Sequence, residues 1–82
     1  MDVTRTYTVI LEPAEEGGYV VHVPALPEVV TEGENEAEAL AMAKEAIELA
    51  LEVRRAEGET LPTERAPQMR QVTVRVAEPS AA

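Results

Sequence analysis

Residues 17–27 read GGYVVHVPALP, and this stretch contains one complete strand together with the signals that begin and end it. Hydrophobic side chains alternate from Tyr19 to Val23, which is the period-two pattern of a half-buried β-strand. The paired glycines before the alternation are typical of a hairpin turn, and the prolines after it cannot donate to a sheet ladder. The sequence therefore predicts a strand over residues 18–23.

The segments on either side predict two further strands. Residues 6–11 (TYTVIL) alternate with the same period, and residues 13–18 (PAEEGG) connect them to the next strand as a polar hairpin loop. A short strand is expected over residues 29–32, just before Gly33. Three strands in tandem with tight connections predict an antiparallel meander.

A change of period after Gly33 predicts a helix over residues 36–57. Asn35 is a favourable N-cap with Glu38 three residues later, and Gly58 suits the position that follows a helix. At about 100° per residue, the apolar residues cover an unusually wide arc. Its centre is a stripe of small residues, Ala39, Ala43, Ala46 and Ala50, and its two edges are Leu40, Ile47 and Leu51, and Met42, Leu49 and Val53.

The width of this arc leaves two interpretations open. The alanines allow the helix to lie close to the sheet with larger residues straddling it, or the second edge packs on another copy of the chain. A small core without large aromatic residues favours self-association as an additional source of stability. We therefore expect a homodimer or tetramer in which Met42, Leu49 and Val53 contribute to the interface.

Residues 70–77 (RQVTVRVA) alternate cleanly after a proline-containing connection over residues 59–68, and they predict a fourth strand. The predicted order is β-β-β-α-β, an α+β fold with one helix packed on a four-stranded, mainly antiparallel sheet. We expect a single domain over residues 1–82, with an ordered core at about 5–77.

Composition excludes several classes of function. The 82 residues include 16 acidic and 7 basic side chains, a net charge of −9, which argues against nucleic-acid binding and suits a basic protein partner. Without cysteine there is neither a disulfide nor a thiolate metal site. Without a long apolar run or a signal-peptide pattern, we expect a cytoplasmic protein that does not enter a membrane.

Residues 7–62 resemble the HicB-like antitoxin family, through GGYVVHVPALP (17–27), TEGENEAEAL (31–40), AKEAIELALE (43–52) and GETLP (58–62). The resemblance implies a truncated RNase H-like fold, self-association, and binding to a small basic HicA toxin, an mRNA interferase whose catalytic surface the antitoxin covers. An orphan module with another protein partner is the alternative that the same resemblance leaves open.

The sequence departs from the family in two places. Many members have a glycine-containing turn where this chain has Pro27, Glu28 and Val29, which puts a partner contact there in doubt. Many members also carry a C-terminal DNA-binding domain, whereas six residues follow Val76 here. We therefore expect no direct nucleic-acid binding.

Acidic residues are the best candidates for contacts with a basic toxin. As a group they would attract such a partner electrostatically. For any one of them, the simpler interpretation is a solvent-exposed charge that contributes only to solubility. The residues concerned are Glu15, Glu16, Glu28, Glu32 and Glu34.

Catalytic chemistry is the remaining alternative. A metal-dependent, RNase H-like nuclease needs several converging carboxylates, for which Glu12, Glu32, Glu34 and the N-terminal Asp2 are available, but solvated charge explains them better. His22 has no nucleophile or second metal ligand near it in sequence, and we expect a structural or surface role. The sequence thus predicts no catalytic residue, metal or cofactor.

Overall fold

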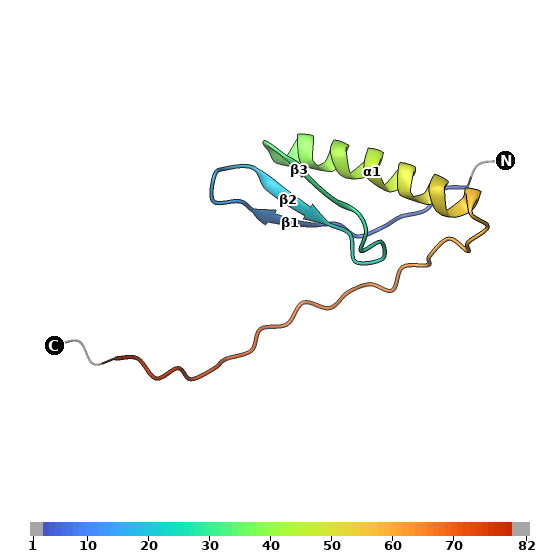
Figure 1. The fold of residues 1–82 in the computed structure, drawn as a ribbon. Helices are drawn as coiled ribbons and strands as arrows, with labels where there is room; N and C mark the ends of the chain where they lie inside the picture. Colours follow the sequence, from blue (N-terminus) through green and yellow to red (C-terminus); the bar gives the residue numbers. More distant parts are fainter. Residues whose placement is uncertain (1–2, 80–82) are drawn as a thin grey trace.

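A computed structural model describes residues 3–79 of the chain. It contains a three-stranded antiparallel sheet followed by one helix, in the order β1 (Ile10–Pro13), β2 (Tyr19–His22), β3 (Val30–Gly33) and α1 (Glu36–Ala56) (Figure 1). β2 is the central strand, with β1 and β3 as its two neighbours. The helix lies across one face of this sheet, so the body of the molecule has two layers.

The pairing register assigns each strand residue to one face of the sheet. Leu11, Val21 and Thr31 form one row, and Val21 is fully buried against Ala39 and Ala43 of α1. Since alternate residues point to opposite faces, the neighbouring rows lie on the face away from the helix. That open face carries Ile10, Glu12, Val20, His22, Val30 and Glu32.

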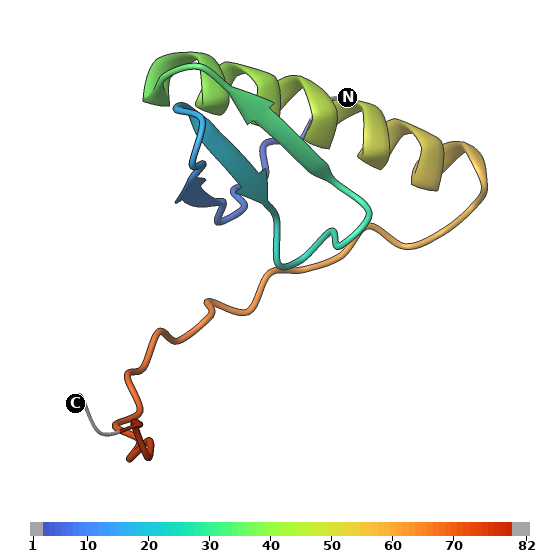
Figure 2. The same cartoon turned by 60° about the vertical axis from the view of Figure 1, so that its left-hand side comes forward.

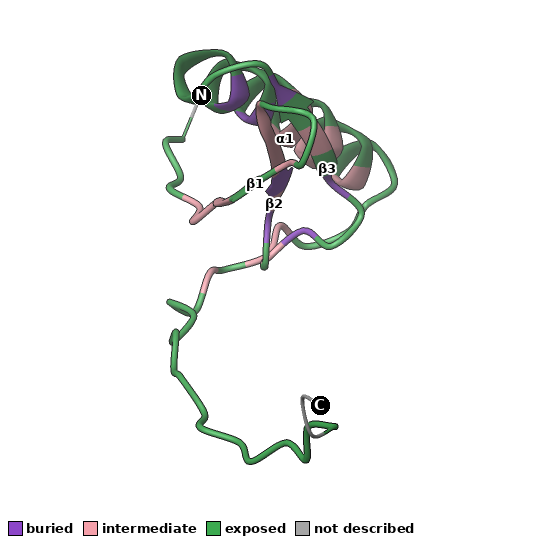
Figure 3. Cartoon of the chain, turned by 90° about the vertical axis from the view of Figure 1, so that its left-hand side faces the viewer, coloured by how far each residue is buried: buried purple, intermediate pink, exposed green. Residues whose placement is uncertain are grey.

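Small residues allow the helix to lie close to the sheet. Ala39 and Ala43 are buried, and a Cβ atom added at Gly33 would come within 2.3 Å of the backbone nitrogen of Ala39. The buried hydrophobic core is correspondingly small, and Figure 3 shows the buried residues in purple on α1, along β2 and in the segment after β2. Its members are Val21, Val23, Leu26, Val29, Ala39 and Ala43. The structure therefore shows the close approach through alanine that the sequence left as one of two interpretations.

Both ends of α1 are capped as the sequence predicts. The Asn35 side chain accepts a hydrogen bond of 2.8 Å from the backbone nitrogen of Glu38. At the other end Gly58 has a φ of +77°, its N–H donates to the carbonyl of Arg55, and the N–H of Glu59 donates to the carbonyl of Arg54. These two bonds form a Schellman motif, which ends the helix.

The prediction of a fourth strand is wrong. Residues 70–77 form no strand, and the chain after Glu64 leaves the body as an extended tail (Figures 1 and 2). Its three valines are 83%, 72% and 70% exposed, at Val72, Val74 and Val76. The radius of gyration is 17.4 Å, whereas a compact chain of this length has about 12 Å. The fold is therefore β-β-β-α with a three-stranded sheet.

The start of the tail explains this difference. The Tyr7 hydroxyl donates to the Pro62 carbonyl at 2.8 Å, and the backbone and side chain of Thr8 both donate to the Glu64 carboxylate. Figure 1 shows the tail running in the direction of β1 from this point. Beyond this contact, residues 65–79 are exposed, and the alternating residues 70–77 pair with no strand of the sheet.

The strands also differ from their predicted limits. β1 begins at Ile10, opposite the last residue of β2, instead of at residue 6. After His22 the chain turns away, with the Leu26 N–H donating to the Val23 carbonyl at 2.9 Å. Residues 6–9 therefore have no ladder partner on β2, although Tyr7 and Val9 still pack against the core. No helix in the described part of the chain is both long and apolar enough to cross a membrane.

Candidate binding surface

The open face of the sheet is one half of the candidate surface. His22 lies there, as its alternation predicts, with Nε2 3.4 Å from Oε1 of Glu12 across the β1–β2 pair. Val20 occupies the centre of the row between Glu12 and Glu32. The face thus combines aliphatic side chains with carboxylates, and the helix covers only the opposite side.

An acidic groove adjoins this face at one end of the sheet. It has a volume of about 500 Å³ and lies where the β1–β2 turn, the end of β3 and the first turn of α1 meet. A Cβ atom added at Gly18 would come within 2.6 Å of the Gly33 carbonyl oxygen, so these two glycines allow the close approach. Four carboxylates line the groove, those of Glu16, Glu32, Glu34 and Glu38.

The helix favours negative charge at this end of the molecule. Glu36 and Glu38 occupy the first turn of α1, where the helix dipole is positive. The Glu38 carboxylate also accepts a hydrogen bond of 3.4 Å from the backbone nitrogen of Glu34. Local interactions therefore hold the ends of β3 and α1 together and concentrate the carboxylates between them.

The structure divides the acidic residues that the sequence grouped together. Glu16, Glu32 and Glu34 line the groove, whereas Glu15 is exposed in the adjacent turn. Glu28 lies before the opposite end of β3, where its carboxylate accepts two hydrogen bonds from Arg54, at 2.8 and 2.9 Å. These hydrogen bonds hold the pKa of Glu28 below its usual value. Glu28 is therefore paired within the chain and stands apart from the groove.

Glu38 is the groove residue that the sequence analysis missed. It was assigned only to the helix cap, although the same position puts its side chain beside the end of β3. The two-residue connection between β3 and α1 was the available signal, since it forces the first turn of the helix to lie next to the strand end.

The carboxylates are poorly arranged for metal-dependent cleavage. Glu12 and Glu32 stand on β1 and β3 with β2 between them, so their backbones are about 10 Å apart. Among residues 3–79 there is no group of three or more acidic, histidine or cysteine side chains that could hold a metal ion. Asp2, the other carboxylate considered, lies outside the described residues. The carboxylates of the groove instead suit charge-assisted hydrogen bonds from the lysines and arginines of a partner.

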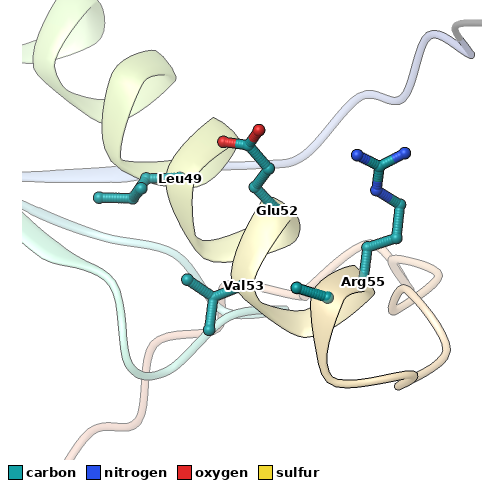
Figure 4. Close-up of a pocket in the computed structure, with 5 residues that line it drawn as sticks. Leu49, Glu52, Val53 and Arg55 are labelled. Atoms are coloured by element: carbon teal, nitrogen blue, oxygen red, sulfur yellow. The ribbon is translucent and has the colours of Figure 1, made fainter.

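A second, apolar groove lies on the other side of the molecule. Leu49 and Val53 project from the same side of α1, away from Glu52 and Arg55 (Figure 4). They are 63% and 49% exposed, and Met42, two turns before Leu49 on the same edge of the helix, is 41% exposed. Leu49 and Val53, together with Val29 and Val30, line a groove of about 530 Å³ between α1 and the start of β3. We call this the α1–β3 groove.

Comparison with known proteins identifies the family. The profile described as "HicB_like antitoxin of bacterial toxin-antitoxin system" matches residues 7–78. The chain belongs to this family. The resemblance seen in the sequence is thereby confirmed, and it extends into the tail.

Individual HicB-like relatives support the same conclusion. Antitoxin HicB 1 of Photorhabdus laumondii is 46% identical over 56 residues, which are 68% of this chain and 36% of that protein. Antitoxin HicB of Escherichia coli K12 is 43% identical over 56 residues, or 68% and 41% of the two chains. A UPF0150 protein of Thermoplasma acidophilum is 45% identical over 60 residues, or 73% and 87%. The match thus spans less than half of the two curated antitoxins.

Proposed function

We propose that this HicB-like chain neutralises a small, basic, HicA-like mRNA interferase by binding it and covering its catalytic surface. The chain supplies no catalytic group and no cofactor in this function, and it binds no nucleic acid directly. It works in the cytoplasm as a homodimer or tetramer. Membership of the antitoxin family supports the general function, and the acidic groove beside the open sheet face supports this form of binding.

The acidic groove is the observation that carries the proposal. Glu16, Glu32, Glu34 and Glu38 face a common space, and no hydrogen bond from a basic side chain is found on any of them within residues 3–79. A toxin that cleaves RNA presents positive charge to phosphates, and the same charge is attracted by these carboxylates. The adjacent open face supplies the apolar area that an interface core needs.

Co-expression with the small protein encoded beside this gene tests the proposal. The purified partner is assayed for RNA cleavage with and without this chain, and a stable complex that silences cleavage is the expected result. A partner that binds without any RNA-cleaving activity would favour the orphan module with another function. Failure to form any complex would reject the proposal.

Charge reversal tests the location of the interface. The double variant Glu32→Lys/Glu34→Lys is expected to weaken toxin binding by about tenfold or more, because it puts like charges in contact. Its matched control is Glu45→Lys/Glu48→Lys, which makes the same change in net charge on the solvent side of α1. Equal affinities of the two double variants would place the toxin elsewhere on the molecule.

A further inference from the structure

The tail has the opposite charge to the rest of the chain. Residues 65–77 contain Arg65, Arg70 and Arg75 and no acidic residue. Residues 1–64 contain 15 acidic and 4 basic residues, a net charge of −11. A basic toxin would repel these arginines, whereas another copy of this acidic body attracts them.

The tail is also apolar along one side. Val72, Val74 and Val76 occupy every second position, so an extended backbone presents all three on one side. Each is at least 70% exposed, and together they form an apolar ridge without a cover in the described chain. A short alternating segment of this kind binds in an extended conformation, with its side chains in a groove.

The α1–β3 groove fits this segment in shape and in charge. Its apolar lining includes Leu49, Val53 and Val30, the last of which is 59% exposed. Glu57 and Glu59 also line it, while Glu28 and Arg54 there neutralise each other. β3 has a strand neighbour on one side only, so the backbone of its outer edge is available for pairing over the described residues.

The tail of the same chain begins on the wrong side of the sheet to reach this groove. The contacts of Tyr7 with Pro62 and of Thr8 with Glu64 hold its start beside β1. β1 and β3 are opposite edges of the sheet, and Figure 2 shows the tail leaving the body on the side away from α1. A second copy brings its tail to the groove without this constraint.

We propose that residues 70–77 of one copy lie extended in the α1–β3 groove of a second copy, and that the exchange is reciprocal. Val72, Val74 and Val76 contact Leu49 and Val53, and Arg70, on the same side of the extended segment, lies near the acidic rim of the groove. This deepens the self-association proposed above by naming its two surfaces. Each chain keeps its three-stranded sheet, because the added contact is between chains.

Sedimentation of the purified full-length chain, without any toxin, tests the proposal. Val74→Glu puts a charge on the apolar side and is expected to raise the dissociation constant of the oligomer by about tenfold or more. Thr73→Glu makes the same change in charge one residue away, on the other side of the strand, and is expected to leave association within about twofold of the wild-type value. Both variants alter residues 70–77, which are exposed in the single chain, so neither is expected to unfold the body.

Engineered disulfides identify the contact, since the chain has no cysteine of its own. A mixture of Leu49→Cys and Val74→Cys chains is expected to form a covalent heterodimer under oxidising conditions, more rapidly than Leu49→Cys with Thr73→Cys. The double variant Leu49→Cys/Val74→Cys is expected to cross-link between chains.

Three results overturn the proposal. A wild-type chain that is monomeric at all concentrations refutes both self-association and this mode of it. An oligomer that Val74→Glu and Thr73→Glu leave equally intact refutes the insertion of residues 70–77 in the α1–β3 groove, but not self-association itself. A disulfide confined within one chain shows that the tail returns to its own body. None of these results bears on toxin binding, which is measured separately.

Discussion

Glu28 and Arg54 show how one ion pair links the loop before β3 to the last turn of α1. Two hydrogen bonds, at 2.8 and 2.9 Å, join the carboxylate and the guanidinium in a bidentate arrangement. The pair connects segments 26 residues apart in sequence. It therefore supports the position of the helix end, although its exposure to solvent keeps the contribution small.

This pair predicts a pH-dependent effect of Glu28→Gln. The pKa of Glu28 in the folded chain is lowered from 4.5, so its stabilising contribution is present above that value and is lost as the pH falls through the folded pKa. Glu28→Gln should therefore lower the Tm slightly at pH 7 and by a smaller amount at pH 3. Thermal unfolding at both pH values measures this, with Glu45→Gln as the control.

Gly33 is required for space and not for an unusual backbone angle. A Cβ atom there would collide with the backbone of Ala39, so Gly33→Ala should destabilise the fold by about 1–3 kcal/mol or more. Gly17 has a φ of +97° with nothing within 4 Å of an added Cβ, and Gly17→Ala should cost only the conformational term of about 1–2 kcal/mol. Urea unfolding compares the two, and a larger loss for Gly17→Ala would contradict the packing argument.

Among the elements, α1 is the one whose limits the sequence predicted best. The expected helix over residues 36–57 is observed as Glu36–Ala56, because side-chain and backbone caps at both ends are local features of the chain. Strand limits were predicted less well, because a strand needs a partner. Tyr7 and Val9 alternate correctly and contact the core, yet nothing on β2 lies opposite them.

The N-cap predicts a specific loss of helix stability. Asn35→Ala removes the acceptor for the Glu38 backbone nitrogen and should destabilise the chain by about 1 kcal/mol. Asn35→Asp retains an acceptor oxygen at the same place and should restore most of this loss. Chemical denaturation followed by circular dichroism gives both values, and equal stability of the two variants would argue against the capping role.

Alternation in residues 70–77 predicted a half-buried fourth strand, whereas the structure leaves the three valines of this segment exposed. An alternating pattern indicates that one side of an extended segment is apolar. It does not indicate which surface that side packs against, because this depends on where the segment leaves the folded body. Here the Thr8 contact with Glu64 fixes that origin, and such a contact between distant residues leaves no periodic signal in the sequence. The acidic groove has a similar limit: the sequence named Glu16, Glu32 and Glu34 but not Glu38, and it could not separate them from Glu28, which forms an ion pair at the other end of β3.

At the scale of the whole molecule, body and tail are expected to contribute unequally to stability. A chain ending after Glu64 keeps the sheet, the helix and the contacts of Tyr7 and Thr8, so at low protein concentration its Tm should match that of the full chain. A chain ending after Glu59 loses those contacts and should be less stable by about 1–3 kcal/mol. Calorimetry distinguishes the two, and an equal loss in both would show that the tail stabilises its own body.

The two tyrosines provide the molecule with separate optical reporters. With no tryptophan in the chain, near-ultraviolet absorption and emission come from Tyr7 and Tyr19 alone. Tyr7 is bonded to the origin of the tail, and Tyr19 lines the acidic groove. A Tyr7→Phe chain therefore reports spectroscopically on the groove, and a Tyr19→Phe chain reports on the release of the tail. Changes at the acidic groove and at the origin of the tail can thus be followed independently without attaching a dye.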